Sequence, residues 1–273
     1  RIPVFCFLQD EHQWVESMSL SYQEKVWEAI YAQGEFIQRF LPVSDFYSDY
    51  MQQKLRLPPE KFQTIYPGIS LEDFVPSSST TAAIGYVSRW DHRLGLGVLF
   101  DAFSLLKEEK KFKEWKLFIL GGKAEEDEKF LAQAKRKLEE KKIFQDIQFF
   151  PHFHEKARKE FYSQISILCV PNSQGEAFGL FLLEAQASCI PVVQPLVGSY
   201  PEILQKTQGG ILCESCCAEA LAAKLSELIL VPEIRQKLGM QGRMGVQNFF
   251  TVEQMAKQIE SVFLKEKNCA DGV

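Results

Sequence analysis

From residue 82 onward, short apolar runs alternate with amphipathic helical segments, and this alternation restricts the fold more than any other feature. Strands are predicted at AIGYVS, WKLFILG, IQFFPH, ISILCVP, PVVQP and GGILC. Helices are predicted near 95–109, 125–142, 155–164, 178–189, 200–206, 217–230, 232–247 and 251–266. Because strands that alternate with helices form a parallel sheet with helices on both faces, we expect an α/β domain of that kind.

Residues 1–70 are predicted to form part of a second, smaller unit of the same kind. Strands are predicted at VFCFLQ, FLPVS and FQTIYPGI, and helices at SYQEKVWEAIYAQGEFIQRF and SDFYSDYMQQKLR. Three strands make a thin sheet, and the sequence begins without Met almost inside a strand. We therefore expect a truncated domain whose exposed strand edge favours self-association. The turn-rich stretch PGISLEDFVPSSSTT predicts a boundary near 67–80, so that the second domain covers 71–250.

Charge and composition narrow the choice of partners. The chain of 273 residues has a net charge of -5 and no basic stripe, so nothing favours nucleic acid. The mixed-sign stretches KEEKKFKEWK and KRKLEEKK are interpreted as solvated helix ends, with peripheral membrane contact as the alternative. No apolar run approaches the ~18 residues of a membrane span, and no signal peptide is visible.

Cysteine usage indicates a reducing compartment. Several of the seven cysteines, such as Cys169 and Cys189, lie in apolar, core-like runs, which fits reduced thiols in the cytoplasm. The segment CESCC, residues 213–217, suggests a metal site, but no second Cys/His cluster of zinc spacing accompanies it. We therefore expect no metal and no other cofactor.

Two glutamates stand with seven residues between them in the segment GEAFGLFLLEA, residues 175–185. Glu176 is predicted on the loop after the ISILCVP strand, and Glu184 about two turns into a helix that starts near Phe178. Ligands bind open α/β sheets at the carboxyl ends of strands, and a helix N-terminus there suits phosphate. At a rise of ~1.5 Å per residue, the carboxylates are on the order of 10 Å apart, which suits an elongated sugar nucleotide. The alternative is a loop acid and a solvent-facing helix residue.

Five segments in order resemble the retaining GT-B glycosyltransferases called group 1 or family 4. They are TIYPGISLEDFVP, GYVSRWDHRLGLGVLFDAF, LFILGG, VPNSQGEAFGLFLLEAQASCIPVV, and VGSYPEIL with GGILC. The resemblance covers about residues 60–250 and rests on the order and spacing of the segments. It implies a GT-B-like fold: a Rossmann-type domain that binds the donor, a truncated second Rossmann-like domain on the acceptor side, and a C-terminal crossover helix and tail at 251–273.

The same resemblance implies roles for individual residues. Glu176 would contact the hydroxyls of the donor sugar, and Glu184 would hold the ribose. Arg89 matches the family's diphosphate-binding arginine, which offsets the charge that a departing nucleotide diphosphate gains. The backbone amides around Phe178, Gly179 and Leu180 would also contact the diphosphate. Glu176 and Arg89 are the catalytic candidates, and the alternative for Arg89 is a surface ion pair.

The sequence departs from the family pattern beside Arg89. The family places a lysine immediately before the Gly-Leu of its helix, but Leu94 stands there and cannot neutralise phosphate. Arg93 and Lys123 are the candidate replacements. A shift of one residue turns a helical side chain by ~100°, so Arg93 is not an automatic substitute.

Two histidines and the segment after the first strand are further candidates. Family members often carry a His-Asp pair after an early strand, where this chain has Gln9 and Asp10, with His12 close by. His12 is interpreted either as facing the cleft or as a surface residue at a helix start, and Asp10 as a helix N-cap. His152 lies at the end of the IQFFPH strand. It is expected either to line the pocket for the nucleotide base or to have only a structural role in the core or at the rim.

Three functions stay open at this point. The first is transfer of a sugar from a nucleotide donor to an unknown glycan, lipid or small-molecule acceptor. The second is sugar-nucleotide binding without turnover, which Leu94 favours. The third is epimerisation of a nucleotide sugar, which needs further acid/base groups, and the chain has only four histidines. The sequence names neither the sugar nor the base.

Overall fold

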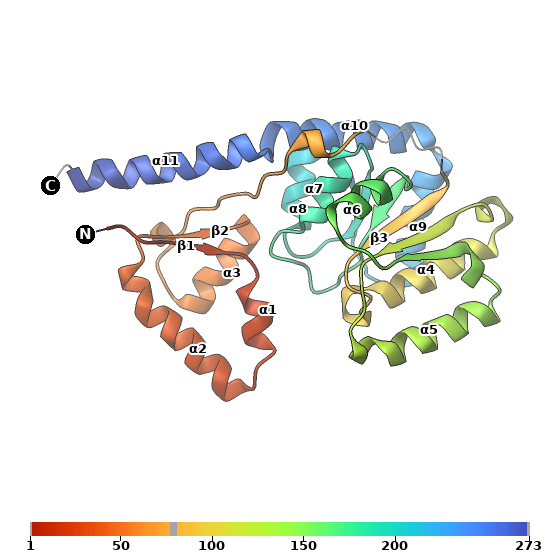
Figure 1. Cartoon of the computed structure of the whole chain (residues 1–273), viewed down its shortest axis with the longest axis horizontal. Coiled ribbons are helices and arrows are strands. Elements are labelled where there is room, and N and C mark those ends of the chain that lie inside the picture. The colour runs from red at the N-terminus through yellow and green to blue at the C-terminus, as the bar shows by residue number, and fades with distance from the viewer. Residues whose placement is uncertain (1, 77–80, 272–273) are drawn as a thin grey trace. The chain divides into compact units, whose positions relative to one another are not determined.

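The computed structural model describes residues 2–76 and 81–271, with the side chains of 267–271 excepted. It divides into two units, and each is described by itself (Figure 1). Unit 1 contains Arg1–Ile69, Glu176–Gly179 and Phe250–Val273, and unit 2 contains Ser70–Gly175 and Leu180–Phe249. Residues 77–80 of the predicted boundary and the last two residues of the predicted tail lie outside the described residues.

Unit 2 is built on a parallel sheet of six strands in the order β5-β4-β3-β6-β7-β8. The strands are β3 (Ala83–Val87), β4 (Lys116–Leu120), β5 (Ile147–Phe150), β6 (Ile167–Cys169), β7 (Val192–Pro195) and β8 (Gly210–Cys213). Every residue of β3 is buried, as expected for a strand covered on both faces. The predicted Rossmann-type sheet is confirmed.

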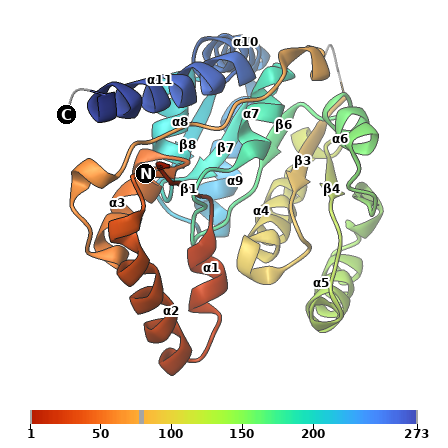
Figure 2. The same ribbon diagram turned by 60° about the vertical axis from the view of Figure 1, so that its left-hand side comes forward.

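The helices of unit 2 lie in two groups on either side of this sheet (Figure 2). They are α4 (Leu96–Glu108), α5 (Glu128–Glu140), α6 (Glu155–Tyr162), α7 (Leu180–Ala187), α8 (Tyr200–Thr207), α9 (Ala218–Leu230) and α10 (Pro232–Phe249). Helix α4 packs against α5 and α9, whereas α10 packs against α7 and α8 and, less extensively, α9.

The strand order changes direction at β3. Strands β4 and β5 follow on one side of β3, and β6, β7 and β8 follow on the other. The carboxyl ends of β3 and β6 therefore flank the topological switch point of the sheet. In open α/β sheets this is where ligands bind, so the fold places any ligand site of unit 2 between the loops after β3 and β6.

Unit 1 has a two-stranded parallel sheet and four helices among the described residues. The strands are β1 (Phe5–Leu8) and β2 (Arg39–Pro42), and the helices are α1 (Glu11–Glu16), α2 (Leu20–Gln33), α3 (Asp45–Leu55) and α11 (Val252–Asp271). In α11, Val262 packs with Leu41 and Ile65 in a buried cluster, against which Met255 and Ile259 also pack. Glu266 pairs with Arg39 at 2.5 Å.

Two predictions for unit 1 are wrong. The helix predicted to reach Phe40 ends at Gln33, because the chain turns at Gly34 and Arg39 already begins β2. The strand predicted at FQTIYPGI is replaced by a single bridge between Phe40 and Phe62.

The reason for the missing strand lies in β2. Gln63 and Ile65 donate backbone hydrogen bonds to Phe40 and Pro42, each at 2.9 Å. A parallel ladder also needs a return bond from the amide at position 42, and proline has no N–H to donate. The segment therefore follows β2 without forming a regular strand.

No helix within the described ranges is both long enough and apolar enough to span a bilayer.

Candidate functional site

The loops after β3 and β6 meet at the switch point of unit 2. Gly95, the residue before α4, has φ +84, and a Cβ built on it would lie 2.0 Å from the carbonyl oxygen of Pro171. Only glycine combines that backbone conformation with so close an approach. Gly95 thus lets the loop that carries Arg89 pack directly on the loop that leads to α7.

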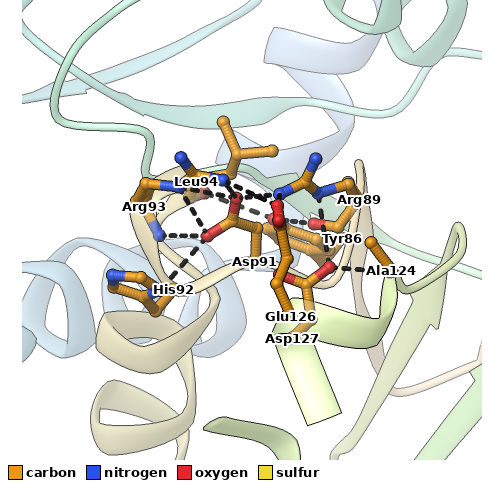
Figure 3. Close-up of polar contacts among 9 residues, drawn as sticks. All are labelled: Tyr86, Arg89, Asp91, His92, Arg93, Leu94, Ala124, Glu126 and Asp127. Carbon is orange, nitrogen blue, oxygen red and sulfur yellow. Dashed lines mark hydrogen bonds and ion pairs between the residues drawn. The ribbon is translucent and has the colours of Figure 1, made fainter. Parts of the chain in front are cut away.

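Arg89 is held by three carboxylates (Figure 3). Its Nη2 lies 2.6 Å from Asp91 and 2.8 Å from Glu126, and its Nε lies 3.3 Å from Asp127. Glu126 and Asp127 come from the short 3-10 turn Glu125–Asp127 after β4. Arg89 therefore makes ion pairs within the protein, which was the alternative role considered for it beside binding of a diphosphate.

Asp91 is the centre of this cluster and is 3% exposed. It caps the 3-10 turn His92–Leu94 by accepting from the Arg93 N–H at 2.9 Å. The same carboxylate accepts from Arg93 Nη2 at 2.6 Å. Burial raises the pKa of Asp91, but the hydrogen bonds from Arg93 and the charges of Arg93 and Arg89 outweigh it, so the net pKa is lowered. Asp91 is therefore ionised and binds both arginines at neutral pH.

The other predicted cations and histidines lie outside this network. Lys123 pairs with the exposed Glu128 at 2.8 Å. His152 is exposed, and its ring stacks on that of His154 with centroids 6.1 Å apart. His154 caps α6 by accepting from the backbone N–H of Ala157 at 3.2 Å.

Glu184 is buried, with 6% of its surface exposed, and is held by two residues of α6. Arg158 Nη1 donates to one carboxylate oxygen at 2.7 Å, and the Tyr162 hydroxyl donates to the other at 2.9 Å. Burial raises the pKa of Glu184, and the Arg158 charge and the Tyr162 hydrogen bond oppose it. The alternative of a solvent-facing helix residue is wrong. Sequence reasoning missed Arg158 and Tyr162, although their i,i+4 spacing puts them on one helix face.

The loop after β6 is shaped by a buried asparagine. Asn172 is 1% exposed; its amide donates to the carbonyl of Gly175 at 3.1 Å and accepts from the Gln174 N–H at 3.0 Å. Gly175 has φ +74, and a Cβ there would meet Gly198 at 2.7 Å. The loops after β6 and β7 are therefore in contact as well.

The candidate residues fall in both units. Glu176, Phe178 and Gly179 belong to unit 1, and Phe178 and Gly179 are buried there. Leu180 opens α7 in unit 2 and is exposed. Unit 2 also holds Arg89, Arg93, Lys123, His152 and Glu184.

The early segment of unit 1 differs from one expectation. Asp10 precedes α1 but makes no side-chain cap; its carboxylate accepts from the Ala177 N–H at 3.3 Å. The ring of His12 contacts those of Tyr47 and Tyr50, with centroids 5.2 and 4.9 Å apart. Across the described residues no group of three or more His, Cys, Asp or Glu side chains is arranged to hold a metal ion.

Comparison with known proteins gives a family match over most of the chain. The profile of the family described as "Glycosyl transferases group 1" matches residues 72–244. The N-acetyl-alpha-D-glucosaminyl L-malate synthase of Bacillus anthracis is 33% identical over 91 residues, which are 33% of this chain and 24% of that protein. The capsular polysaccharide biosynthesis glycosyltransferase CapM of Staphylococcus aureus is 26% identical over 78% of this chain and 53% of that protein. The chain thus spans about half or less of the length of these curated relatives.

Solved structures agree on the GT-B fold. Sucrose-phosphate synthase from Thermosynechococcus elongatus superposes with a TM-score of 0.78 at 22% identity, covering 93% of this chain and 66% of that one. The Anabaena protein HepE in complex with UDP superposes with a TM-score of 0.83 at 15% identity, covering 96% and 72%. At these identities the likeness shows the fold alone.

Proposed function

Because the chain belongs to the group 1 glycosyl transferases, we propose that it transfers a sugar from a nucleotide-sugar donor, with retention, to a glycan, lipid or small-molecule acceptor. One observation carries the proposal. The loop with Arg89 and Arg93 and the loop that leads to Glu184 flank the switch point of the sheet, where open α/β folds bind ligands.

In this proposal Glu184 holds the donor ribose. Both of its oxygens already accept one hydrogen bond, but each carboxylate oxygen has a second lone pair for a hydroxyl. Glu176 contacts the sugar, the amides of Phe178, Gly179 and Leu180 contact the diphosphate, and Arg89 stabilises the leaving group. Lys123 and His152 are proposed at the edges of the donor site.

A second candidate is nucleotide-sugar binding without transfer. The observation that favours it is the engagement of Arg89, Arg93 and Lys123 by carboxylates, together with Leu94 in the place of a lysine. A departing diphosphate would have to compete with these carboxylates for the Nε and Nη2 donors of the arginines and for the Lys123 ammonium. Loss of such a charge partner in the transition state commonly slows a reaction roughly a hundredfold or more.

Calorimetric titration tests donor binding. UDP, GDP and ADP are titrated into the wild-type chain and into Glu184→Gln, Arg89→Ala and, as a control on the far end of α5, Arg136→Ala. Loss of a charge-assisted hydrogen bond should cost about 1.5–3 kcal/mol, or more than tenfold in affinity, in the first two variants. Unchanged affinity in both would discard the residue assignments.

A coupled nucleotide-release assay with a panel of donors then separates the two candidates. Acceptor-dependent release would support transfer. Nucleotide binding without release would support the binding-only candidate.

The proposal extends to the location of the protein and to its further partners. The cysteines with described side chains are free thiols, which supports a cytoplasmic location. Self-association through the edge of the β1–β2 sheet, and peripheral membrane contact through the mixed-charge helix ends, stay proposals. The reaction as proposed uses no metal and no nucleic acid.

A further inference from the structure

Arg89 and Arg93 share one carboxylate oxygen. The Nη2 atoms of both arginines lie 2.6 Å from Oδ2 of Asp91. The two Nη2 atoms are therefore at most twice that distance apart. Two guanidinium groups repel one another so close together unless an anion lies between them, and the ionised Asp91 provides that anion.

The position of Asp91 is fixed by the backbone around it. Its carboxylate caps the turn His92–Leu94 through the Arg93 N–H at 2.9 Å, and its own N–H donates to the carbonyl of Arg89 at 2.8 Å. Arg93 Nε also lies 2.9 Å from Oδ2. The carboxylate thus pulls Arg93 back toward Arg89, although Arg93 is not at the position where the family has its lysine.

Each arginine keeps donors for a further anion. A guanidinium has five N–H groups, and the contacts above use Nε and Nη2 of each side chain. No described residue accepts a hydrogen bond from Nη1 of Arg89 or Arg93, and the side chains are 40% and 53% exposed. The two Nη1 groups point to the same side of the cluster, away from Asp91 (Figure 3). Paired guanidinium donors on one side suit the oxygens of a phosphate or diphosphate.

We propose that Asp91 is a positioning residue that holds Arg89 and Arg93 as one phosphate-binding pair, in which Arg93 supplies the positive charge that Leu94 does not. The proposal rests on the donor binding proposed above and adds to it the second cation and the residue that places it. Asp91 itself contacts no ligand; it acts through the two arginines.

The test uses the whole chain and four variants. Arg93→Gln removes the charge at the proposed second cation. Asp91→Asn keeps a side-chain oxygen for the cap but removes the charge between the arginines. The double variant combines the two, and Arg136→Gln is the control, since Arg136 pairs with Glu140 on an exposed face of α5. Calorimetry measures binding of whichever of UDP, GDP and ADP the wild type binds most tightly, of the matching monophosphate, and of pyrophosphate.

Arg93→Gln is expected to weaken diphosphate and pyrophosphate binding about tenfold or more and the monophosphate far less. Asp91→Asn is expected to weaken diphosphate binding about three- to tenfold, because the arginines lose their preorganisation. In the double variant the fold-loss of affinity should be smaller than the product of the two single fold-losses, since Asp91 acts partly through Arg93. Melting temperatures show whether each variant is folded. If the role of Asp91 were purely structural, Asp91→Asn would lower the melting temperature but leave the preference for diphosphate over monophosphate unchanged.

The outcomes separate the two proposals. Nucleotide binding that depends on Glu184 but not on Arg93 or Asp91 would overturn the pair and leave donor binding in place, as would tighter diphosphate binding in Asp91→Asn. Arg93-dependent pyrophosphate binding without nucleotide binding would support the pair and reject the donor site. If the wild type binds neither UDP, GDP, ADP nor pyrophosphate, both proposals fall.

Discussion

Replacing Arg158 by methionine tests how a carboxylate is kept in the interior of unit 2. Glu184 is 6% exposed, and its charge is balanced by Arg158 at 2.7 Å. Methionine keeps much of the arginine's apolar length but removes the charge and the hydrogen bond. The variant leaves Glu184 with the Tyr162 hydroxyl as its remaining described side-chain partner.

The expected loss follows from this burial. Removing one partner of a buried ion pair costs about 3–5 kcal/mol, because the other charge stays buried without compensation. The Arg158 side chain is 30% exposed and Tyr162 still donates, so solvent and the hydroxyl reduce the penalty. We expect the free energy of unfolding to fall by about 2–3 kcal/mol at pH 8.

The loss should depend on pH with a defined sign. Burial already raises the pKa of Glu184 above its ordinary value of 4.5, and without the Arg158 charge it rises further. A carboxyl whose pKa is raised in the folded state stabilises the fold below its unfolded pKa and loses this contribution as pH rises through the folded pKa. The gap between wild type and Arg158→Met should therefore be smaller at pH 5 than at pH 8.

Urea unfolding followed by circular dichroism at pH 5 and pH 8 measures this gap. Lys159→Met is the matched control, because Lys159 is the next residue of α6 and pairs with the exposed Glu155 and Asp73. It should lose little stability and show little change between the two pH values. An equal loss for Arg158→Met at both pH values would refute the reasoning that an unbalanced Glu184 carboxylate causes it.

Three further perturbations address other parts of the structure. Gly95→Ala should lower stability by more than about 2 kcal/mol, since φ is +84 and the new methyl would meet the Pro171 carbonyl oxygen; an unchanged melting temperature would argue against the loop contact. Glu126→Gln, which removes an exposed carboxylate from Arg89, should strengthen nucleoside diphosphate binding about two- to fivefold by calorimetry, and weaker binding would contradict the competition described above. Val262→Ala should cost about 1–3 kcal/mol in urea unfolding because it empties part of the unit 1 core; no loss would mean that α11 contributes little there.

The sheet of unit 2 could be predicted because its strands are almost uniformly apolar. In β3, Ile84 and Tyr86 lie on one face of the sheet and Gly85 on the other, and all of its residues are buried. An apolar run of this kind predicts a strand covered on both faces without knowledge of the neighbouring strands. The segment FQTIYPGI also carries apolar residues, Phe62, Ile65 and Ile69, but they alternate with polar and turn-forming residues. Its outcome was decided by Pro42 on the neighbouring strand, which a local pattern does not register.

Sequence reasoning could name candidate residues for the site but not the side chains that they pair with. Arg89 and Glu184 could be named from motifs along the chain. The carboxylates that hold Arg89 come partly from the turn after β4, and the cation that holds Glu184 comes from α6. Such contacts are set by the sheet order, which brings distant loops together only once the fold exists.

The way the chain leaves and re-enters unit 1 has a consequence for the order of folding. The backbone N–H of Ile69 donates to the carbonyl of Phe250 at 2.9 Å, and all of unit 2 lies between these two residues of unit 1 in the sequence. In unit 2 every strand pairing except β3–β6 joins strands that follow one another along the chain, whereas in unit 1 Leu41 and Ile65 pack against Val262 from the far end of the chain. The core of unit 1 therefore depends on contacts of greater sequence separation than most of the sheet of unit 2.

During synthesis at about 5–20 residues per second, the first strands of unit 1 emerge long before the helix that covers them. Once unit 2 has folded, it brings Ile69 and Phe250 together and lowers the loop-closure entropy for docking α11. Unit 1, which the ribosome begins first, is thus expected to be completed last, and a nascent chain that stops before residue 250 should expose the apolar side of β1 and β2 to chaperones or to other chains.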